Sequence, residues 1–316
     1  MLFFLQFLSI STVVLAAKTI LLTNDDGWAS TNIRATYRDL KSAGYDVILV
    51  APVSQRSGWG GKFDVPQTKE LLNDGEFGYV KKGAPSWGQD QDDKNIWYFN
   101  GTPSSCVSFA LDYLFPEYYS DKTIDYVFAG PNEGPNLTPG FFTVSGTMGA
   151  TYSAIYRGIP AVSFSGSDFN NSFFKDSLNN DESNPANIYA KKVVEIAQKL
   201  SNASTPLPPR TGLSINFPKV GTLKSSCTNP VWQYTRVDGS CIFQQNMAYN
   251  KDSGLMKLGV ECYDVQSGYK VDDYGLAGEY SVYLADNCTT TLSVFSTEYD
   301  ASQDEIQTIH NILNLA

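Results

Sequence analysis

Two adjacent carboxylates, Asp25 and Asp26, directly follow the apolar run 19–23 and precede a glycine. Like charges placed side by side cost free energy unless something offsets them, and a divalent cation would do so. The alternative is that one aspartate caps the following helix while the other faces solvent, and the pair alone favours this alternative. The loops that accompany the pair decide between the two interpretations.

Oxygen-bearing side chains also follow two other predicted strands, at the points where these strands end. The predicted strand 45–52 leads into a loop that contains Ser57, and the predicted strand 124–130 leads to Asn132. In open parallel sheets, ligands bind at the carboxyl ends of the strands. Two carboxylates, a hydroxyl and an amide carbonyl are an oxygen set that suits Mg²⁺, Mn²⁺ or Ca²⁺. We therefore favour a metal site over a helix cap.

Two predicted helix starts could bind an anion, one at Gly101 to Ser105 and one at Val144 to Thr147. Free backbone N–H groups and hydroxyl side chains suit phosphate there, although ordinary N-capping is the alternative for each. Beside an oxygen-ligated cation, they indicate metal-dependent phosphoester hydrolysis. The single histidine, His310, lies in a predicted C-terminal helix, which argues against histidine-dependent hydrolases and phosphatases.

Strand and helix signals alternate through the first two-thirds of the chain and would position these loops. The predicted strands are 19–23, 45–52, 124–130, 159–166 and 212–218, and the predicted helices are 31–44, 100–115, 146–158, 184–200 and 302–315. This alternation predicts an α/β fold with a mostly parallel sheet covered by helices on both faces. After about residue 220 the sequence becomes polar and rich in Tyr and Gly, which indicates β-hairpins and loops.

Length and charge restrict the class of protein. With 316 residues, 42% of them hydrophobic, the chain can bury a full core as one large domain with a smaller appendage. There are 33 acidic and 23 basic residues, the net charge is −10, and no basic run stands out. A nucleic-acid duplex and an anionic membrane surface are therefore not expected partners.

The first 17 residues are uncharged, mostly apolar and end in small residues. They resemble a secretory signal peptide over 1–17, with a buried N-terminal strand or helix as the alternative. We expect a secreted, extracellular protein, with the vacuole or the cell wall as other destinations. Glycosylation sequons occur at Asn100, Asn136, Asn170, Asn202 and Asn287, and Asn202 has the most favourable surroundings.

Cysteine usage agrees with export. Four of the five cysteines, Cys227, Cys241, Cys262 and Cys288, lie in one C-terminal stretch, which is compatible with two disulfides in three possible pairings. Nearness in sequence favours Cys227–Cys241 and Cys262–Cys288. Cys106 lies in an apolar segment and is predicted to be buried and unpaired.

Five ordered motifs carry a family resemblance: NDDG (24–27), APVSQRSG (51–58), NGTPSSCV (100–107), AGPNEGPNL (129–137) and VSGTMGA (144–150). Together they resemble the SurE family of phosphatases and nucleotidases. The likeness resumes at DDYGLAGEYSVYL (272–284). Ser105 stands where the family usually has Asp, and Ala129 to Asn132 replaces its usual Ser-Gly-Ile-Asn.

The resemblance implies a three-layer α/β/α, Rossmann-like core over about 18–220 and a β-rich, disulfide-containing C-terminal extension over about 221–316, which helps homodimers form. It also implies a divalent-metal-dependent phosphomonoesterase acting on 5'- or 3'-nucleoside monophosphates and other small phosphate monoesters. For a secreted member, acid phosphatase activity is the expectation. The alternative is a secreted, non-catalytic nucleotide- or partner-binding protein with the same fold.

Matched motif by motif, the metal ligands are Asp25, Asp26, Ser57 and Asn132, which would hold one divalent cation, Mg²⁺ or Mn²⁺. Asp25 and Asp26 are also the candidate catalytic residues, to orient or deprotonate a water, while an aspartate nucleophile stays open. The residues assigned to the substrate phosphate are Asn24, Gly58, Thr102, Asn136, Ser145, Gly146 and Thr147.

Overall fold

The computed structural model describes residues 17–237, 241–264, 276–297 and 300–315, so nearly all of the predicted signal peptide lies outside the described residues. The main elements in chain order are β1 (Thr19–Thr23), α1 (Thr31–Ser42), β2 (Asp46–Pro52), β3 (Trp87–Gln89), β4 (Ile96–Phe99), α2 (Pro103–Phe109), α3 (Phe115–Tyr118), β5 (Tyr126–Asn132), α4 (Thr138–Val144), α5 (Gly146–Ile155), β6 (Ala161–Ser165), α6 (Phe174–Ser177), α7 (Pro185–Asn202), β7 (Thr211–Asn216), β8 (Val231–Thr235), β9 (Cys241–Asn250), β10 (Leu255–Asp264), α8 (Glu279–Leu284), β11 (Thr289–Ser296) and α9 (Gln303–Leu313).

Nine of the described strands form one sheet, in the order β3-β4-β2-β1-β5-β6-β7-β11-β8. All neighbours from β4 to β7 are parallel, whereas β3 is antiparallel to β4 and β11 is antiparallel to β7. The central strand β1 buries all five of its residues, as expected of a strand covered on both faces. The predicted mostly parallel α/β sheet is confirmed.

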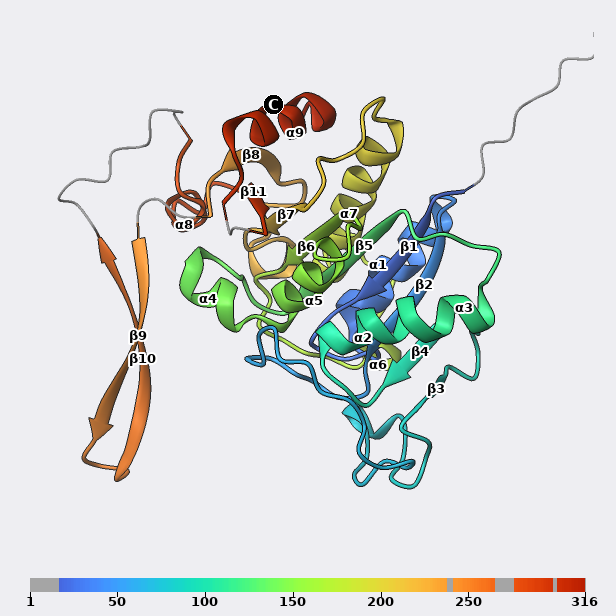
Figure 1. Ribbon diagram of the computed structural model, residues 1–316. Helices are drawn as coiled ribbons and strands as arrows, with labels where there is room; N and C mark the ends of the chain where they lie inside the picture. Colours follow the sequence, from blue (N-terminus) through green and yellow to red (C-terminus); the bar gives the residue numbers. More distant parts are fainter. Residues whose placement is uncertain (1–16, 238–240, 265–275, 298–299, 316) are drawn as a thin grey trace, which may run out of the picture.

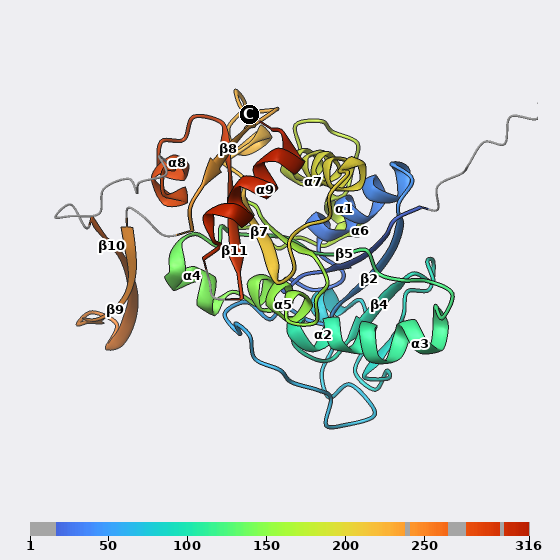
Figure 2. The same ribbon diagram turned by 45° about the horizontal axis from the view of Figure 1, so that its top comes forward.

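Helices cover both faces of this sheet because side chains alternate along each strand. Ile20 and Leu22 pack into one core with α1, α7 and α9, whereas Leu21 packs into a second core with α2 and α5. Figure 2 shows the sheet between α1 and α7 above and α2, α3 and α5 below. In the described part of the chain, no helix is both long enough and apolar enough to cross a bilayer.

The predicted strands are confirmed as β1, β2, β5, β6 and β7, and the predicted helices as α1, α2 with α3, α5, α7 and α9. A π-helical turn over Ala110–Leu114 joins α2 to α3. Sequence reasoning missed β3 and β4, which lie at the end of the Gly- and Asp-rich excursion from about 60 to 95. It also missed α4, whose TPGFFTV sequence contains a proline in the first turn, where the missing N–H does no harm.

The C-terminal segment divides into two parts. Its strands β8 and β11 join the central sheet, where β11 pairs with β7. The β9–β10 hairpin forms a separate antiparallel pair that stands apart from the sheet, on the side of α4 (Figure 1). The polar, Tyr-rich region was predicted to form hairpins and loops, and the structure adds the two sheet strands.

One disulfide joins Cys227 to Cys288, so the predicted pairs Cys227–Cys241 and Cys262–Cys288 are wrong. The reason lies in the sheet: β8 and β11 run side by side with Val231 opposite Thr289, which brings the segments preceding both strands together. The side chains of Cys241 and Cys262 lie outside the described residues. Cys106 is buried and unpaired, as predicted.

Glu279, the first residue of α8, connects three elements although it is fully buried. Its Oε1 accepts the N–H of Thr138 at 2.8 Å, where α4 begins, and its Oε2 accepts the hydroxyl of Ser293 in β11 at 2.9 Å. Burial raises the pKa of the Glu279 carboxyl to about 8. The carboxyl therefore stays protonated in the folded protein over a range where it ionises in the unfolded chain.

Breaking the disulfide with Cys288→Ser should lower the free energy of unfolding by about 2–4 kcal/mol, because the bond closes a long loop in the unfolded chain. The two cysteines are 61 residues apart. Denaturant unfolding with and without reductant measures the loss. A non-reducing peptide map should link the Cys227 and Cys288 peptides, and a Cys227–Cys241 peptide would contradict this pairing.

The Glu279 carboxyl should make folding less favourable as the pH rises. From its ordinary value of 4.5 to about 8, the folded state holds a proton that the unfolded state has lost. Stability then falls by up to about 1.4 kcal/mol per pH unit. From about pH 5 to about pH 8, the free energy of unfolding should fall with rising pH in wild type. Glu279→Gln lacks this carboxyl, so it should become more stable relative to wild type as the pH rises. The exposed control Glu117→Gln should run parallel to wild type, and a parallel Glu279→Gln curve would refute the effect.

Candidate functional site

The carboxyl ends of β2, β1, β5 and β6 lie next to one another because these strands are neighbours in the sheet. The loop after β1 carries Asp25 and Asp26, and β5 ends at Asn132. Two hydrogen bonds tie the loops together: the Arg56 N–H donates to the Asp25 carbonyl at 2.6 Å, and the Glu133 N–H donates to Asp26 Oδ2 at 3.0 Å. The structure thus brings the loops that carry Asp25 and Asp26, Ser57, and Asn132 to one edge of the sheet.

Asp25 is buried against the start of α5. Its Oδ1 accepts the Thr147 hydroxyl at 2.6 Å, and the backbone N–H groups of Gly146 and Thr147 also favour its charged form. Burial outweighs these contacts and raises the pKa of Asp25. A Cβ on Gly146 would lie 2.8 Å from Asp25 Cβ and 3.0 Å from Pro103 Cγ, so only glycine lets α5 begin this close to the carboxylate.

Asp26 is equally buried but has fewer partners. Its Oδ2 accepts the Glu133 N–H, whereas its Oδ1 has no hydrogen-bond partner in the described part of the chain. Burial, the neighbouring charge of Asp25 and the carboxylates of Glu133 and Asp168 all raise its pKa well above the ordinary value. An ionised Asp26 therefore requires a positive charge that these residues do not supply.

Asn132 has a second buried oxygen that lacks a hydrogen-bond partner among the described residues. Its Nδ2 donates to the Gly134 carbonyl at 2.6 Å, and its Oδ1 has no partner among the described residues. The strand becomes irregular here, with a register shift between Ala129 and Asn132. Gly130, at φ +111°, allows it, since a Cβ there would lie 2.1 Å from the Phe164 carbonyl oxygen.

Ser57 lies in the loop after β2 and is exposed. The loop is fixed at both ends: the Trp28 N–H donates to the Pro52 carbonyl at 3.0 Å, and the Gly60 N–H donates to the Val144 carbonyl at 2.9 Å, just before α5. Gly58 beside it is also exposed, with φ +79°. The hydroxyl of Ser57 therefore stands on an anchored loop within reach of solvent.

The donor chemistry fits a hard cation, because two buried oxygens at the edge where both carboxylates lie, Asp26 Oδ1 and Asn132 Oδ1, accept no hydrogen bond from any described residue. No group of three or more His, Cys, Asp or Glu side chains is arranged for a metal among the described residues. The predicted set contains only two carboxylates, with a hydroxyl and an amide as its other ligands, and it stays a prediction.

Sequence reasoning missed two residues after β6. Asn171 donates its Nδ2 to the Asp26 carbonyl at 2.9 Å, and Asp168 accepts Asn32 Nδ2 at 3.0 Å. Each has an Oδ1 without a partner among the described residues, and burial raises the pKa of Asp168 to about 7. The same rule about the carboxyl ends of strands, applied to the strand 159–166, would have indicated them.

Several residues assigned to the substrate phosphate form hydrogen bonds within the protein that close loops or cap helices. Asn24 closes its own loop, with Oδ1 accepting the Gly27 N–H at 3.2 Å. Thr102 caps α2 and its Oγ1 accepts the Asp64 N–H at 3.1 Å, while Ser145 caps α5. The buried Asn136 donates to Ser165 Oγ at 2.8 Å. Gly146 and Thr147 contact Asp25, as described above.

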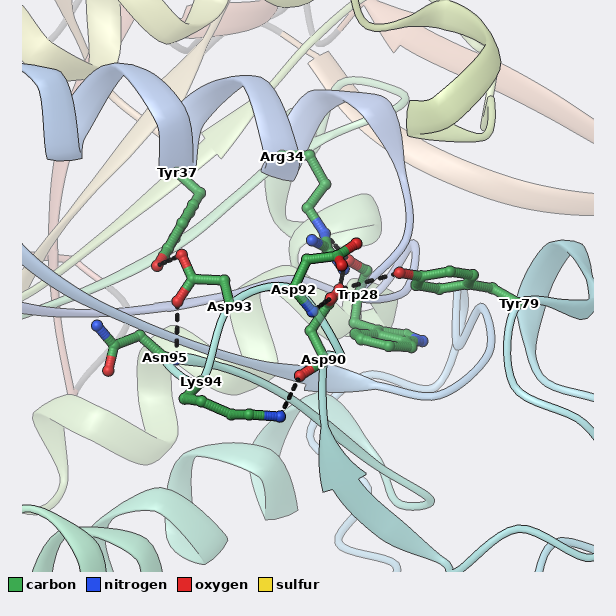
Figure 3. A network of polar contacts seen from close by, with 9 residues as sticks. All are labelled: Trp28, Arg34, Tyr37, Tyr79, Asp90, Asp92, Asp93, Lys94 and Asn95. Atoms are coloured by element: carbon green, nitrogen blue, oxygen red, sulfur yellow. Dashed lines mark hydrogen bonds and ion pairs between the residues drawn. The ribbon is translucent and has the colours of Figure 1, made fainter.

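A buried ion pair fixes the far side of the loop after β1 (Figure 3). Arg34 of α1 donates Nε–H to the Trp28 carbonyl at 2.7 Å, and its Nη2 lies 2.6 Å from Asp90 Oδ2. Tyr79 donates to the same carboxylate oxygen at 3.3 Å. Trp28 stands two residues after Asp26, so this network limits how far the aspartate loop can move.

His310 lies in α9, where its ring stacks on Tyr234 of β8 with centroids 3.6 Å apart. Burial lowers its pKa. Neither His310 nor Tyr234 belongs to the loops described above, so the histidine is not part of this edge.

Comparison with known proteins agrees with this geometry. The family described as "Survival protein SurE" matches residues 20–239. An acid phosphatase of Yarrowia lipolytica is 42% identical over 289 residues, which are 90% of this chain and 80% of that protein. A 5'-nucleotidase SurE of Solidesulfovibrio magneticus is 32% identical over 200 residues, which are 63% and 65% of the two chains.

The crystal structure of the SurE protein from Aquifex aeolicus has the same fold, with a TM-score of 0.59, 23% identity and coverage of 93% of this chain and 99% of that one. The family match spans well over half of the chain, from β1 to the residues beyond β8. The resemblance carried by the five sequence motifs is confirmed, and this chain belongs to the SurE family.

Proposed function

We propose that this chain is a metal-dependent phosphomonoesterase that releases phosphate from nucleoside monophosphates and other phosphate monoesters, as an acid phosphatase or a 5'- or 3'-nucleotidase. The observation that carries the proposal is the buried pair Asp25 and Asp26, together with two buried oxygens, Asp26 Oδ1 and Asn132 Oδ1, that have no hydrogen-bond partner in the part of the chain that the structure describes. The acid phosphatase and 5'-nucleotidase relatives support it.

One divalent cation, Mg²⁺ or Mn²⁺, would be held by Asp25, Asp26, Ser57 and Asn132. When bound, such an ion polarises a phosphoryl oxygen and lowers the pKa of water. Its positive charge would also offset the repulsion between the two buried aspartates.

The two aspartates have different tasks in this proposal. Asp25 is held by Thr147 and the start of α5, so it acts as a fixed anchor. Asp26 keeps Oδ1 without a partner among the described residues, so it is the group that orients or deprotonates the attacking water. The exposed Gly58, next to Ser57 in the loop after β2, would offer a backbone N–H to the phosphate.

Secretion of the mature chain from about residue 18 is also a proposal. It rests on the apolar first 17 residues, and the Cys227–Cys288 disulfide is compatible with an oxidising destination such as the medium, cell wall or vacuole. Among the sequons, Asn202 is exposed at the end of α7 and suits a glycan. Asn136 is buried and hydrogen-bonded, so it does not.

We further propose a homodimer through the segment from about 221 to 316. Its β9–β10 hairpin exposes Met247, Tyr249, Leu255 and Met256, each more than half accessible. Exposed apolar side chains gathered on one projecting element are typical of an interface, and a second copy would cover them.

Replacement of Asp26 by Asn should abolish catalysis without unfolding the protein. Phosphate release from p-nitrophenyl phosphate should fall by about a hundredfold or more. EDTA should have the same effect on wild type, with recovery on addition of Mg²⁺ or Mn²⁺. Without metal, the variant should be at least as stable as wild type, because it lacks a buried charge.

The matched control is Asp121→Asn, an exposed aspartate that precedes β5 at the opposite end of the strands and should keep wild-type activity. EDTA-resistant turnover, or near-normal turnover by Asp26→Asn, would refute the metal site. Purified wild type that releases no phosphate from any ester with either metal would instead favour the non-catalytic binding protein.

Gly146→Ala should lower phosphate release about tenfold or more, since its Cβ would push Asp25 or Pro103 away and small displacements at a reacting centre are costly. Gly61→Ala is the control, because a Cβ there meets nothing within 4 Å. Circular dichroism should show both variants folded. Equal activity of the two variants would mean that the approach of α5 to Asp25 is not needed.

A further inference from the structure

Asn170 begins the glycosylation sequon Asn170-Asn171-Ser172, in the loop that follows β6. Its side chain is exposed. Asn136, which begins another sequon, is buried and donates to Ser165. A glycan is bulky and must extend into solvent, so Asn170 can carry one where it stands and Asn136 cannot.

A cavity of about 270 Å³ opens beside this sequon, between the loop after β6 and the starts of α1 and α7. Asn170 itself lines it, together with Asn32, Asp168, Asn179, Asp181 and Asn184. Among the described residues, no aromatic ring lies in its wall. Amides donate and accept hydrogen bonds and carboxylates accept them, so this wall suits a ligand with several hydroxyl groups.

Hydrogen bonds fix the walls of this cavity. The Thr31 N–H and the Thr31 hydroxyl both donate to the Ser172 carbonyl at 2.9 Å, which holds the loop after β6 against α1. On the other side, Asn184 accepts the Ala186 N–H at 3.0 Å at the start of α7 and donates to the Ser177 carbonyl at 3.2 Å. The cavity therefore has a defined shape before any ligand enters.

Two carboxylates in the wall have an oxygen left for a ligand. Asp168 Oδ2 accepts the amide of the buried Asn32 at 3.0 Å, and Asp168 Oδ1 has no partner among the described residues. Asp181 Oδ1 accepts both the N–H and the hydroxyl of Ser183 at 2.9 Å, and within the described chain nothing donates to its Oδ2. Hydroxyl groups of a ligand would make charge-assisted hydrogen bonds to such oxygens.

Phe169 lies next to Asn170 and exposes a large apolar surface. Its side chain is 67% exposed, and its φ of +48° is unusual for a bulky residue. A glycan on the neighbouring residue would shield this ring from water, as glycans generally increase the solubility of the surface around them.

We propose that Asn170 carries an N-linked glycan and that the cavity binds the first sugar of this glycan, N-acetylglucosamine. The inference rests on the proposed secretion, since a transferase of the secretory pathway attaches such glycans. In this step, Asn170 Nδ2 forms a bond to the anomeric carbon of a lipid-linked sugar pyrophosphate. The bond from that carbon to the pyrophosphate oxygen breaks, the pyrophosphate leaves with the electron pair, and a base of the transferase takes one amide proton.

The size of the cavity limits what it can hold. Small-ligand sites have volumes of about 300–1,000 Å³, so 270 Å³ suits one sugar ring and not a longer chain. A bound ring would connect the loop after β6 to the starts of α1 and α7. The same loop contacts the aspartates, because Asn171 Nδ2 donates to the Asp26 carbonyl at 2.9 Å. The glycan would thus stabilise the aspartate loop from outside the proposed metal site.

The test compares Asn170→Gln with wild type, both in protein secreted by a eukaryotic host and in protein made in bacteria without N-glycosylation. In the secreted protein the variant should melt about 2–4 °C below wild type, because the bound sugar is lost. In the bacterial protein the two should melt together, since an exposed amide replaces an exposed amide. Asn202→Gln is the matched control: this exposed sequon at the end of α7 does not line the cavity, and its loss should not lower the melting temperature.

Peptide mass spectrometry of the secreted protein should find N-acetylglucosamine on Asn170. An unmodified Asn170 beside a modified Asn202 would overturn the modification. A glycan on Asn170 whose removal leaves the melting temperature unchanged would overturn its binding in the cavity. Endoglycosidase trimming to a single N-acetylglucosamine should preserve the melting temperature, and a loss as large as that of Asn170→Gln would refute the role of the first sugar.

A separate observation tests the proposed secretion. A full-length chain that stays inside the cell without a glycan on any sequon would refute secretion and not this inference. A host signal peptide placed before residue 18 then delivers the chain to the transferase, and the same comparison of Asn170→Gln with wild type decides the inference.

Discussion

The burial of two neighbouring carboxylates at the end of β1 is the constraint on which this structure depends. Asp25 and Asp26 follow a strand whose five residues are all buried, so their loop cannot rely on water. Thr147 and the start of α5 satisfy Asp25, but Asp26 Oδ1 has no partner among the described residues. A buried oxygen without a hydrogen bond costs about 1–3 kcal/mol, and more if it is charged. The fold therefore maintains a local instability that a bound cation would remove.

The surrounding elements fix the backbone of the loop that carries the two aspartates. Asn24 closes the loop onto Gly27, and Arg34 reaches from α1 to the carbonyl of Trp28 while it pairs with the buried Asp90. Removal of one partner from such a buried pair is typically far more costly than the pair is stabilising. The main effect of the network is thus to position the loop after β1, and its contribution to the free energy of folding is secondary. It holds the backbone of the aspartate loop through the carbonyl of Trp28.

The sequence allowed prediction of those parts of the fold that local patterns determine. Buried runs and helical periodicity predicted the five parallel strands and their helices, and the rule about strand ends brought Asp25, Asp26 and Asn132 together. Pairing between distant segments has no such local signal. The predicted disulfide pairing was wrong for this reason. Cys227 lies next to Cys288 because β8 pairs with β11, and nearness in sequence does not indicate that contact. Asp168 was missed because it follows β6 without a motif beside it.

The departure at Ser105 changes the charge at the start of α2 but not the way in which the helix begins. Ser105 closes the capping box of α2, since its Oγ accepts the Thr102 N–H at 2.8 Å. The aspartate usual in the family pattern would accept the same N–H, so the helix start does not require the change. What differs is charge: Ser105 lies directly against Gly101. The serine therefore places no negative charge near Gly101, while it still closes the capping box at the start of α2.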